Sequence, residues 1–308
     1  MNLNKSLITI TIFFLIFTIA NAIENKIILK IGNEIITNID LDNEIKYLNA
    51  LNNDLKKLEE RQIFEISKKS IIKNKIKEIE ILKNNVKIDT ELMFSDRIVQ
   101  THFAKIGLRD IEEFNQYINS FDLNIKNVKK KILIETLWNQ LIFSKYSNKI
   151  RIDKEKLKKE IIQNKGKSNS FFIYEILFNV SDSSKLANKY QSIKKDIEES
   201  NFKNAALKHS VSDSSINGGE LGWINENSIN KDILNIISKL KINQYSEPIL
   251  TPGGFLILLV SDIKETKKEI NLDEELKKSI QLQTNQQFNQ FSILYYNKIK
   301  KDIIINEF

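Results

Sequence analysis

The sequence predicts a multidomain protein with two kinds of structure, a mainly helical part and a smaller α+β part. Only eight Gly and two Pro occur among 308 residues, so few positions can break a helix. Apolar residues recur at helical spacing along residues 71–82, whereas residues 170–180 and 255–260 are runs rich in β-branched and aromatic residues. Because the two patterns occupy different stretches, we expect separate helical and α+β domains.

The charge pattern argues against a nucleic-acid partner. The net charge is +7, but 47 basic residues are interspersed with 40 acidic ones, as in residues 56–61. Mixed charges of this kind are typical of solvated helix faces rather than of a phosphate-binding stripe. The excess positive charge still allows a weak attraction to an acidic membrane surface or an acidic client.

The residue types that most often hold metals or act as nucleophiles are scarce. No cysteine is present, which excludes disulfides, thiolate nucleophiles and Cys-based zinc sites. The two histidines, His102 and His209, lie far apart in the sequence, so neither a His-rich metal site nor a His-based triad is expected. No nucleotide-binding loop or hydrolase motif occurs either. We therefore expect no metal and no cofactor.

The N-terminus has the three parts of a secretory signal peptide. Lys5 supplies a positive start, an apolar segment follows, and Ala20 and Ala22 form a small-residue cleavage site. The apolar segment from Leu7 to Ile19 has 13 residues, fewer than the ~20 that a membrane-spanning helix needs. We expect residues 1–22 to be removed and the mature chain to have no stable membrane insertion. Retention of the segment as a membrane anchor is the alternative.

Residues 23–166 are expected to form a helical domain that begins with short strands. Ile27 to Thr37 is a pair of β-branched runs separated by a turn, and Thr37 can cap the helix that follows. Helices are expected up to Asn84, from Asp89 to about Gly107, from Asp110 to Ile118, around residues 128–143, and from Asp153 to near Gly166.

Residues 168–264 are expected to form the α+β domain, with element order β-α-α-β-α-β-β. Two glycine pairs, Gly218-Gly219 and Gly253-Gly254, mark tight turns or close backbone approaches. Residues 265–308 are predicted to be a C-terminal helix that packs on the helical domain, because it carries aromatic residues such as Phe288 and Phe291.

The α+β stretch resembles the parvulin (PpiC-type) family of peptidyl-prolyl isomerases. The segment from Val211 to Trp223 contains Gly-Gly-Glu-Leu-Gly-Trp, and the segment from Ser246 to Phe255 follows at the spacing of that family's closing strands. The remaining chain resembles the SurA-type periplasmic chaperones, in residues 28–48, 71–92 and 149–157. That family usually carries two parvulin modules, whereas this chain has room for one.

The resemblance implies a set of site residues. It places a proline pocket at Leu221, Ile229 and Ile233, and a polar catalytic cluster at Glu175, Ser214 and Thr251. Leu256 falls where that family has a histidine, and Glu175 falls where it has another. A leucine neither donates nor accepts a hydrogen bond, so the paired-histidine network of the family cannot form.

Glu175 permits two interpretations. A carboxylate among apolar strand residues is costly to bury and can take a raised pKa and a functional role. Alternatively, its carboxylate lies at the pocket mouth or accepts hydrogen bonds from Ser214 or Thr251. The second interpretation is favoured, because both histidines of the family's network are replaced.

Three functions are therefore considered. The resemblance implies an ATP-independent periplasmic chaperone that binds unfolded outer-membrane proteins and extended peptides, with a weak or inactive isomerase domain. The alternatives are an active prolyl isomerase with an altered polar cluster, and a foldase tethered to the inner membrane by a retained signal segment.

Overall fold

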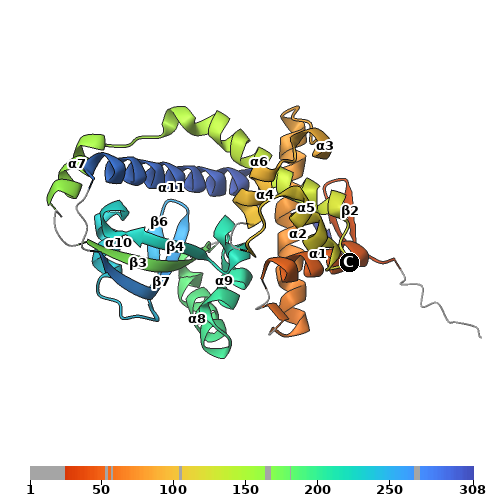
Figure 1. The fold of residues 1–308 in the computed structure, drawn as a ribbon. Helices are drawn as coiled ribbons and strands as arrows, with labels where there is room; N and C mark the ends of the chain where they lie inside the picture. Colours follow the sequence, from red (N-terminus) through yellow and green to blue (C-terminus); the bar gives the residue numbers. More distant parts are fainter. Residues whose placement is uncertain are drawn as a thin grey trace, which may run out of the picture.

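The computed structural model describes residues 25–308, except 53–54, 57, 104–105, 164–167, 181 and 267–270. The predicted signal peptide, residues 1–22, lies outside the described residues. Figure 1 shows a mainly helical region on one side and a twisted sheet with its own helices on the other. Within the described part of the chain, no helix combines the length and apolar character needed to cross a bilayer.

The chain starts with the predicted hairpin, which is confirmed. Strands β1 (Ile27–Ile31) and β2 (Glu34–Thr37) pair antiparallel around a turn at Gly32, whose φ is +58°. A third strand, β8 (Ile305–Glu307), pairs with the other edge of β1 and ties the two ends of the described chain together. The sequence pattern did not indicate this last strand.

The helical region contains α1 (Asn38–Leu51), α2 (Glu60–Lys83), α3 (Thr90–Met93), α4 (Asp96–Phe103), α5 (Ile111–Asn119), α6 (Ile125–Tyr146), the 3₁₀ turn η3 (Ser147–Lys149) and α7 (Lys154–Gln163). Thr37 caps α1 as predicted, and Thr37 and Asp40 form a capping box. One prediction is wrong: the helix expected from Asp89 to Gly107 is two helices. Phe94 lies between them in extended conformation and is buried against Phe114, with 5.2 Å between ring centroids. Burial of this ring requires the backbone to leave the helix.

The α+β region contains β3 (Ser168–Phe178), η4 (Ser183–Lys185), α8 (Leu186–Glu199), α9 (Phe202–His209), η5 (Asp213–Asn217), β4 (Glu220–Asn225), η6 (Glu226–Ser228), α10 (Lys231–Ile237), β5 (Gln244–Tyr245), β6 (Ile249–Thr251) and β7 (Gly254–Thr266). The sheet order is β4-β3-β7-β5, and β6 forms a hairpin with β7. All of these pairings are antiparallel. The predicted combination of a helical region and a sheet-containing region is thus confirmed.

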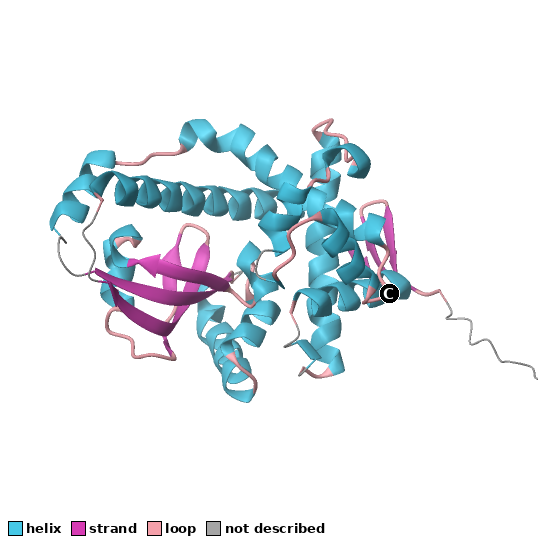
Figure 2. Ribbon diagram, in the orientation of Figure 1, coloured by secondary structure: helices cyan, strands magenta, loops and turns pink. Residues whose placement is uncertain are grey.

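The sheet has two differently covered faces. Phe171, Ile173 and Leu177 of β3 point to one face, where they pack with α10 and with the long C-terminal helix α11 (Leu272–Lys300). Tyr174 and Ile176 point to the other face, toward α8 and α9. Figure 2 shows α11 on one side of the magenta sheet and α8 with α9 on the opposite side. We call the first side the Glu175 face, because strand alternation places Glu175 between Ile173 and Leu177.

Candidate functional site

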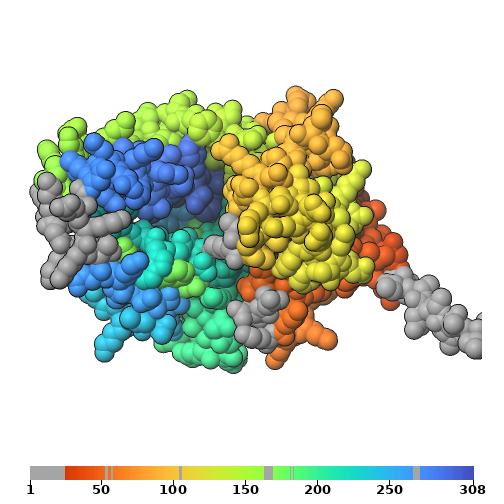
Figure 3. Space-filling model, viewed as in Figure 1, coloured from red at the N-terminus to blue at the C-terminus, as the bar shows by residue number. Residues whose placement is uncertain are grey.

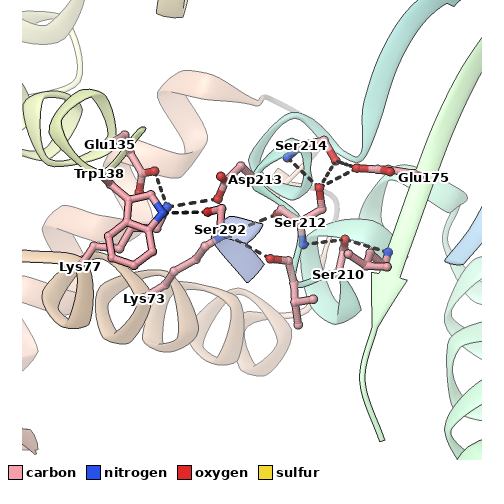
Figure 4. A network of polar contacts seen from close by, with 12 residues as sticks. Lys73, Lys77, Glu135, Trp138, Glu175, Ser210, Ser212, Asp213, Ser214 and Ser292 are labelled. Carbon is pink, nitrogen blue, oxygen red and sulfur yellow. Dashed lines mark hydrogen bonds and ion pairs between the residues drawn. The ribbon is translucent and has the colours of Figure 1, made fainter. Parts of the chain in front are cut away.

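The Glu175 carboxylate is the centre of a small polar cluster. Its Oε1 accepts a hydrogen bond from Ser212 Oγ at 2.5 Å and from Ser214 Oγ at 2.8 Å. The two hydroxyls are also 3.1 Å apart, so the three side chains form one hydrogen-bonded group. Figure 4 shows both serines turned toward Glu175. The structure therefore brings together Glu175 and Ser214, which were predicted to belong to one cluster, and adds Ser212.

A glycine makes this cluster possible. Gly219 has a φ of +79°, and its carbonyl accepts a hydrogen bond from the Glu175 amide at 2.7 Å. A Cβ at this position would lie 2.1 Å from the Glu175 carbonyl oxygen. Any side chain would therefore push the serine-bearing segment away from β3.

Burial raises the pKa of the Glu175 carboxyl group. The two serine hydroxyls act in the opposite direction, because they donate to the charged form, while the nearby Asp213 adds a further rise. The balance favours the neutral acid relative to an exposed glutamate.

Asp213 lies between the two serines in sequence but faces the opposite way. Its Oδ1 is 2.7 Å from Lys73 Nζ and 3.1 Å from Lys77 Nζ, both on α2. Lys77 is 1% exposed and is also 2.5 Å from Glu135 on α6. Burial opposes ionisation of Asp213, but the two lysines outweigh it and hold the pKa of Asp213 well below its ordinary value. The segment from Ser212 to Ser214, which donates hydrogen bonds to Glu175, is thus anchored on the helical region through Asp213, as Figure 4 shows.

The residues predicted to form the proline pocket are only partly assembled. Ile229, Ile233 and Leu256 belong to one apolar cluster on the Glu175 face, with Ile229 and Leu256 buried. Leu221 lies on the edge strand β4 and is 40% exposed. Leu256 pairs with Leu177 in the sheet, so the place of the family's histidine holds an aliphatic side chain of the apolar cluster.

The Thr251 hydroxyl forms its hydrogen bond within its own hairpin. Its Oγ1 donates to the Gly254 carbonyl at 2.8 Å, across the turn that joins β6 to β7. Gly254 is required there, because a Cβ would lie 2.3 Å from Asn179 Oδ1. The hydroxyl thus closes the turn, and Glu175 takes its partners from Ser212 and Ser214 instead.

Both histidines have partners elsewhere. His209 on α9 contacts Asp196 through Nε2, and its Nδ1 is 2.9 Å from Lys189 Nζ. Burial and the neighbouring Lys189 lower the pKa of His209 to about 4 although Asp196 opposes them, so this ring is neutral at physiological pH. His102 on α4 is 3.3 Å from Thr136 Oγ1. Neither contact involves the Glu175 cluster.

Comparison with known protein families identifies the sheet-containing region. The rotamase family described as the PPIC-type PPIASE domain matches residues 176–262. Residues 176–262 form a PpiC-type domain. Glu175 directly precedes the matched segment, whereas Ser212, Ser214 and the residues of the apolar cluster on β7 and α10 lie within it.

Much of the chain is similar to SurA-type chaperones. "Chaperone SurA" of Pseudomonas aeruginosa is 19% identical over 239 residues, which cover 72% of this chain and 57% of that protein. "Foldase protein PrsA" of a Geobacillus species is 39% identical over 70 residues, 23% of this chain and 24% of that protein. A solved structure of one of two SurA-like chaperones of Campylobacter jejuni is 18% identical and covers 92% of this chain and 99% of that chain, with a TM-score of 0.37. The chain spans about half the length of the first curated relatives, at 57%, 45% and 41%.

Sequence reasoning about the PpiC-type domain missed the residues that anchor it. Asp213, Lys73, Lys77 and Glu135 were not singled out as site residues. Lys73 and Lys77 do interrupt the apolar pattern of α2, and this interruption was the available signal. Their partners could not be inferred, because the contact joins segments 136 residues apart.

Proposed function

We propose that this protein is an ATP-independent periplasmic chaperone that binds unfolded outer-membrane proteins and other extended segments, and that its PpiC-type domain is a weak or inactive isomerase. The similarity to proteins named "Chaperone SurA" supports the chaperone role. The predicted signal peptide supports export. The chain covers only part of those relatives, so the client class is proposed from the resemblance, and the exposed apolar side chains of the chain support binding of extended apolar segments.

The observation that carries the proposal is the state of the Glu175 cluster. Rotation about an X-Pro bond is opposed by a barrier of about 20 kcal/mol, so an isomerase must favour the twisted amide. Here two serine hydroxyls already donate to the carboxyl group, Leu256 supplies no polar atom, and both histidines are engaged elsewhere. The carboxyl oxygen Oε1 is thus already engaged by two hydroxyls of the same chain, and no histidine stands beside it.

Client binding is assigned to exposed apolar side chains of the helical region. Leu82 on α2, Leu92 on α3 and Phe143 on α6 are 52%, 86% and 59% exposed. Single contacts of this kind are weak, but several of them along one extended segment act together. Release then needs no nucleotide, because folding of the client removes the segment that binds.

An active isomerase is the second candidate, and one observation favours it. Glu175 is a buried carboxyl group with a raised pKa, a property that is common among catalytic acids. In that case, turnover would depend on Glu175 and on the apolar residue Leu221. Retention of the signal segment as a tether is a separate question, which N-terminal sequencing of the exported protein answers.

The chaperone role is tested by suppression of the aggregation of an unfolded outer-membrane β-barrel protein. We expect Leu82→Ser combined with Leu92→Ser to raise the protein concentration needed for half-suppression by about threefold or more, because two apolar contacts are lost. Ile242→Ser is the matched control, since Ile242 is also 52% exposed but lies on the PpiC-type domain. Equal suppression by the double variant and the control would contradict the assignment of binding to the helical region.

A further inference from the structure

Helix α11 covers the Glu175 face of the PpiC-type domain. Leu282 and Ile293 of α11 pack in the same apolar cluster as Ile229, Ile233 and Leu256. In the space-filling view, α11 (dark blue) lies along the upper side of this domain, beside α6 and α7 (light green) (Figure 3). Two of the three residues predicted to seat a proline ring, Ile229 and Ile233, therefore already pack in one cluster with another part of the same chain.

The contact includes a buried polar pair. Ser228 Oγ, at the end of η6, is 3.1 Å from Ser279 Oγ on α11, and the two serines are 5% and 0% exposed. Ser228 directly precedes Ile229. Farther along the helix, Ile293 Cδ1 would lie 3.7 Å from a Cβ added at Gly253, in the hairpin that carries Thr251. The helix thus touches the domain both beside Ile229 and at the hairpin that carries Thr251.

The opposite side of α11 is fastened to the helical region by larger groups. Ser292 accepts a hydrogen bond from Trp138 Nε1 at 2.8 Å, and Phe291 stacks on Tyr146 with ring centroids 4.7 Å apart. Tyr295 stacks on Trp138 at 5.7 Å. Aromatic rings hold the helix to α6, whereas serines and aliphatic side chains hold it to the PpiC-type domain.

We propose that α11 is a built-in occupant of the Glu175 face, and that a peptide reaches Ile229 and Ile233 only when this face separates from α11. Leu221, which is 40% exposed and lies outside the cluster, stays accessible at the rim while the face is covered. Client binding and the covered state then compete, so the apparent Kd of the domain for peptide is the intrinsic Kd divided by the fraction of molecules in the open state. This inference rests on the proposed function, because it concerns how clients reach the PpiC-type domain.

A reversible crosslink tests the proposal. The chain has no cysteine, so Ser228→Cys combined with Ser279→Cys gives a protein whose only two thiols face each other across this contact. The probe is a short dye-labelled peptide with a Leu-Pro step flanked by aromatic residues, and its Kd is measured by anisotropy on oxidised and reduced forms of one preparation. We expect oxidation to raise the Kd at least about tenfold. The single variant Ser279→Cys, treated with the same oxidant, controls for oxidation itself.

A second variant changes the contact in the opposite direction. Leu282→Ala removes an aliphatic contact from α11, so we expect the peptide to bind about threefold or more tightly than to the unmodified chain. Equal Kd values for the oxidised and reduced forms, including no binding by either, would overturn the inference. Aggregation suppression by the oxidised and reduced forms distinguishes this inference from the proposed function. Loss of suppression in both forms would contradict the proposed chaperone function. Suppression by both forms with a peptide Kd that oxidation does not change would contradict only the role of α11.

Discussion

Glu175 shows how a carboxyl group is accommodated on an apolar strand face. Burial removes it from water, which costs several kcal/mol for a charge without partners. The Ser212 and Ser214 hydroxyls offset part of this cost by donating hydrogen bonds to one of its oxygens. The remaining imbalance appears as a raised pKa. The group is thus accommodated as a structural element of the strand.

The raised pKa of Glu175 predicts a specific pH dependence of stability. Between the unfolded pKa, 4.5, and the higher folded pKa, the folded state keeps a proton that the unfolded state releases. Stability therefore falls as pH rises through this window. Glu175→Gln keeps the hydrogen-bond acceptor and cannot ionise, so we expect its free energy of unfolding, relative to the unmodified protein, to increase from about pH 4 to about pH 8.

Urea unfolding at several pH values measures this difference. Glu198→Gln is the control, because Glu198 is an exposed glutamate on α8. A difference between Glu175→Gln and the unmodified protein that is flat across the pH range would show that Glu175 does not have the raised pKa described above.

At the scale of elements, the short helix η5 joins the two regions of the molecule. Its first residue, Asp213, faces two lysines of α2, while Ser212 and Ser214 on either side face β3. Alternate side chains of this short segment therefore contact α2 of the helical region and β3 of the sheet. The Glu175 cluster is coupled in this way to the position of α2.

We expect Asp213→Asn to lower the free energy of unfolding by roughly 1–3 kcal/mol at neutral pH, because it leaves the buried Lys77 with Glu135 as its remaining carboxylate partner. Asp213 is 41% exposed, so solvent screening keeps the loss below that of a fully buried pair. Because the folded pKa of Asp213 is lowered, this stabilisation is present above the unfolded pKa of 3.8 and fades as pH falls below it.

Denaturant unfolding with Asp42→Asn as the comparison measures the effect. Asp42 forms an exposed ion pair with Lys46 at 3.3 Å, and pairs of this kind contribute about 0.5 kcal/mol or less. Similar losses for the two variants would mean that the Asp213 contact is an ordinary surface pair.

At the scale of the molecule, local patterns predicted the elements and long-range contacts decided their arrangement. The capping box at Thr37 depends on neighbouring residues, so the sequence indicated where it lies. The glycine pairs marked tight turns or close approaches, but the contacts of Gly219 with Glu175 and of Gly254 with Asn179 required the structure. The pairing of β8 with β1 joins residues about 275 positions apart and leaves little local trace.

The packing of α11 is another long-range contact that the sequence could not predict in full. Its apolar residues, which include Leu282, Phe291 and Ile293, lie on more than one side of the helix. Periodicity predicts that such a helix is packed, but it cannot choose the partner. The sequence predicted packing on the helical region, and the additional contact with the PpiC-type domain required the structure. Glu175 and Ser214 were found from a motif, whereas the anchors of the segment that holds them were not.

The most direct test of the account measures two activities on one preparation of the mature chain: suppression of β-barrel aggregation and catalysis of prolyl isomerisation in a protease-coupled assay. The account predicts that the chain suppresses aggregation at near-stoichiometric amounts and leaves the isomerisation rate close to its uncatalysed value. Catalysed turnover that disappears in Glu175→Ala and in Leu221→Ala would contradict it.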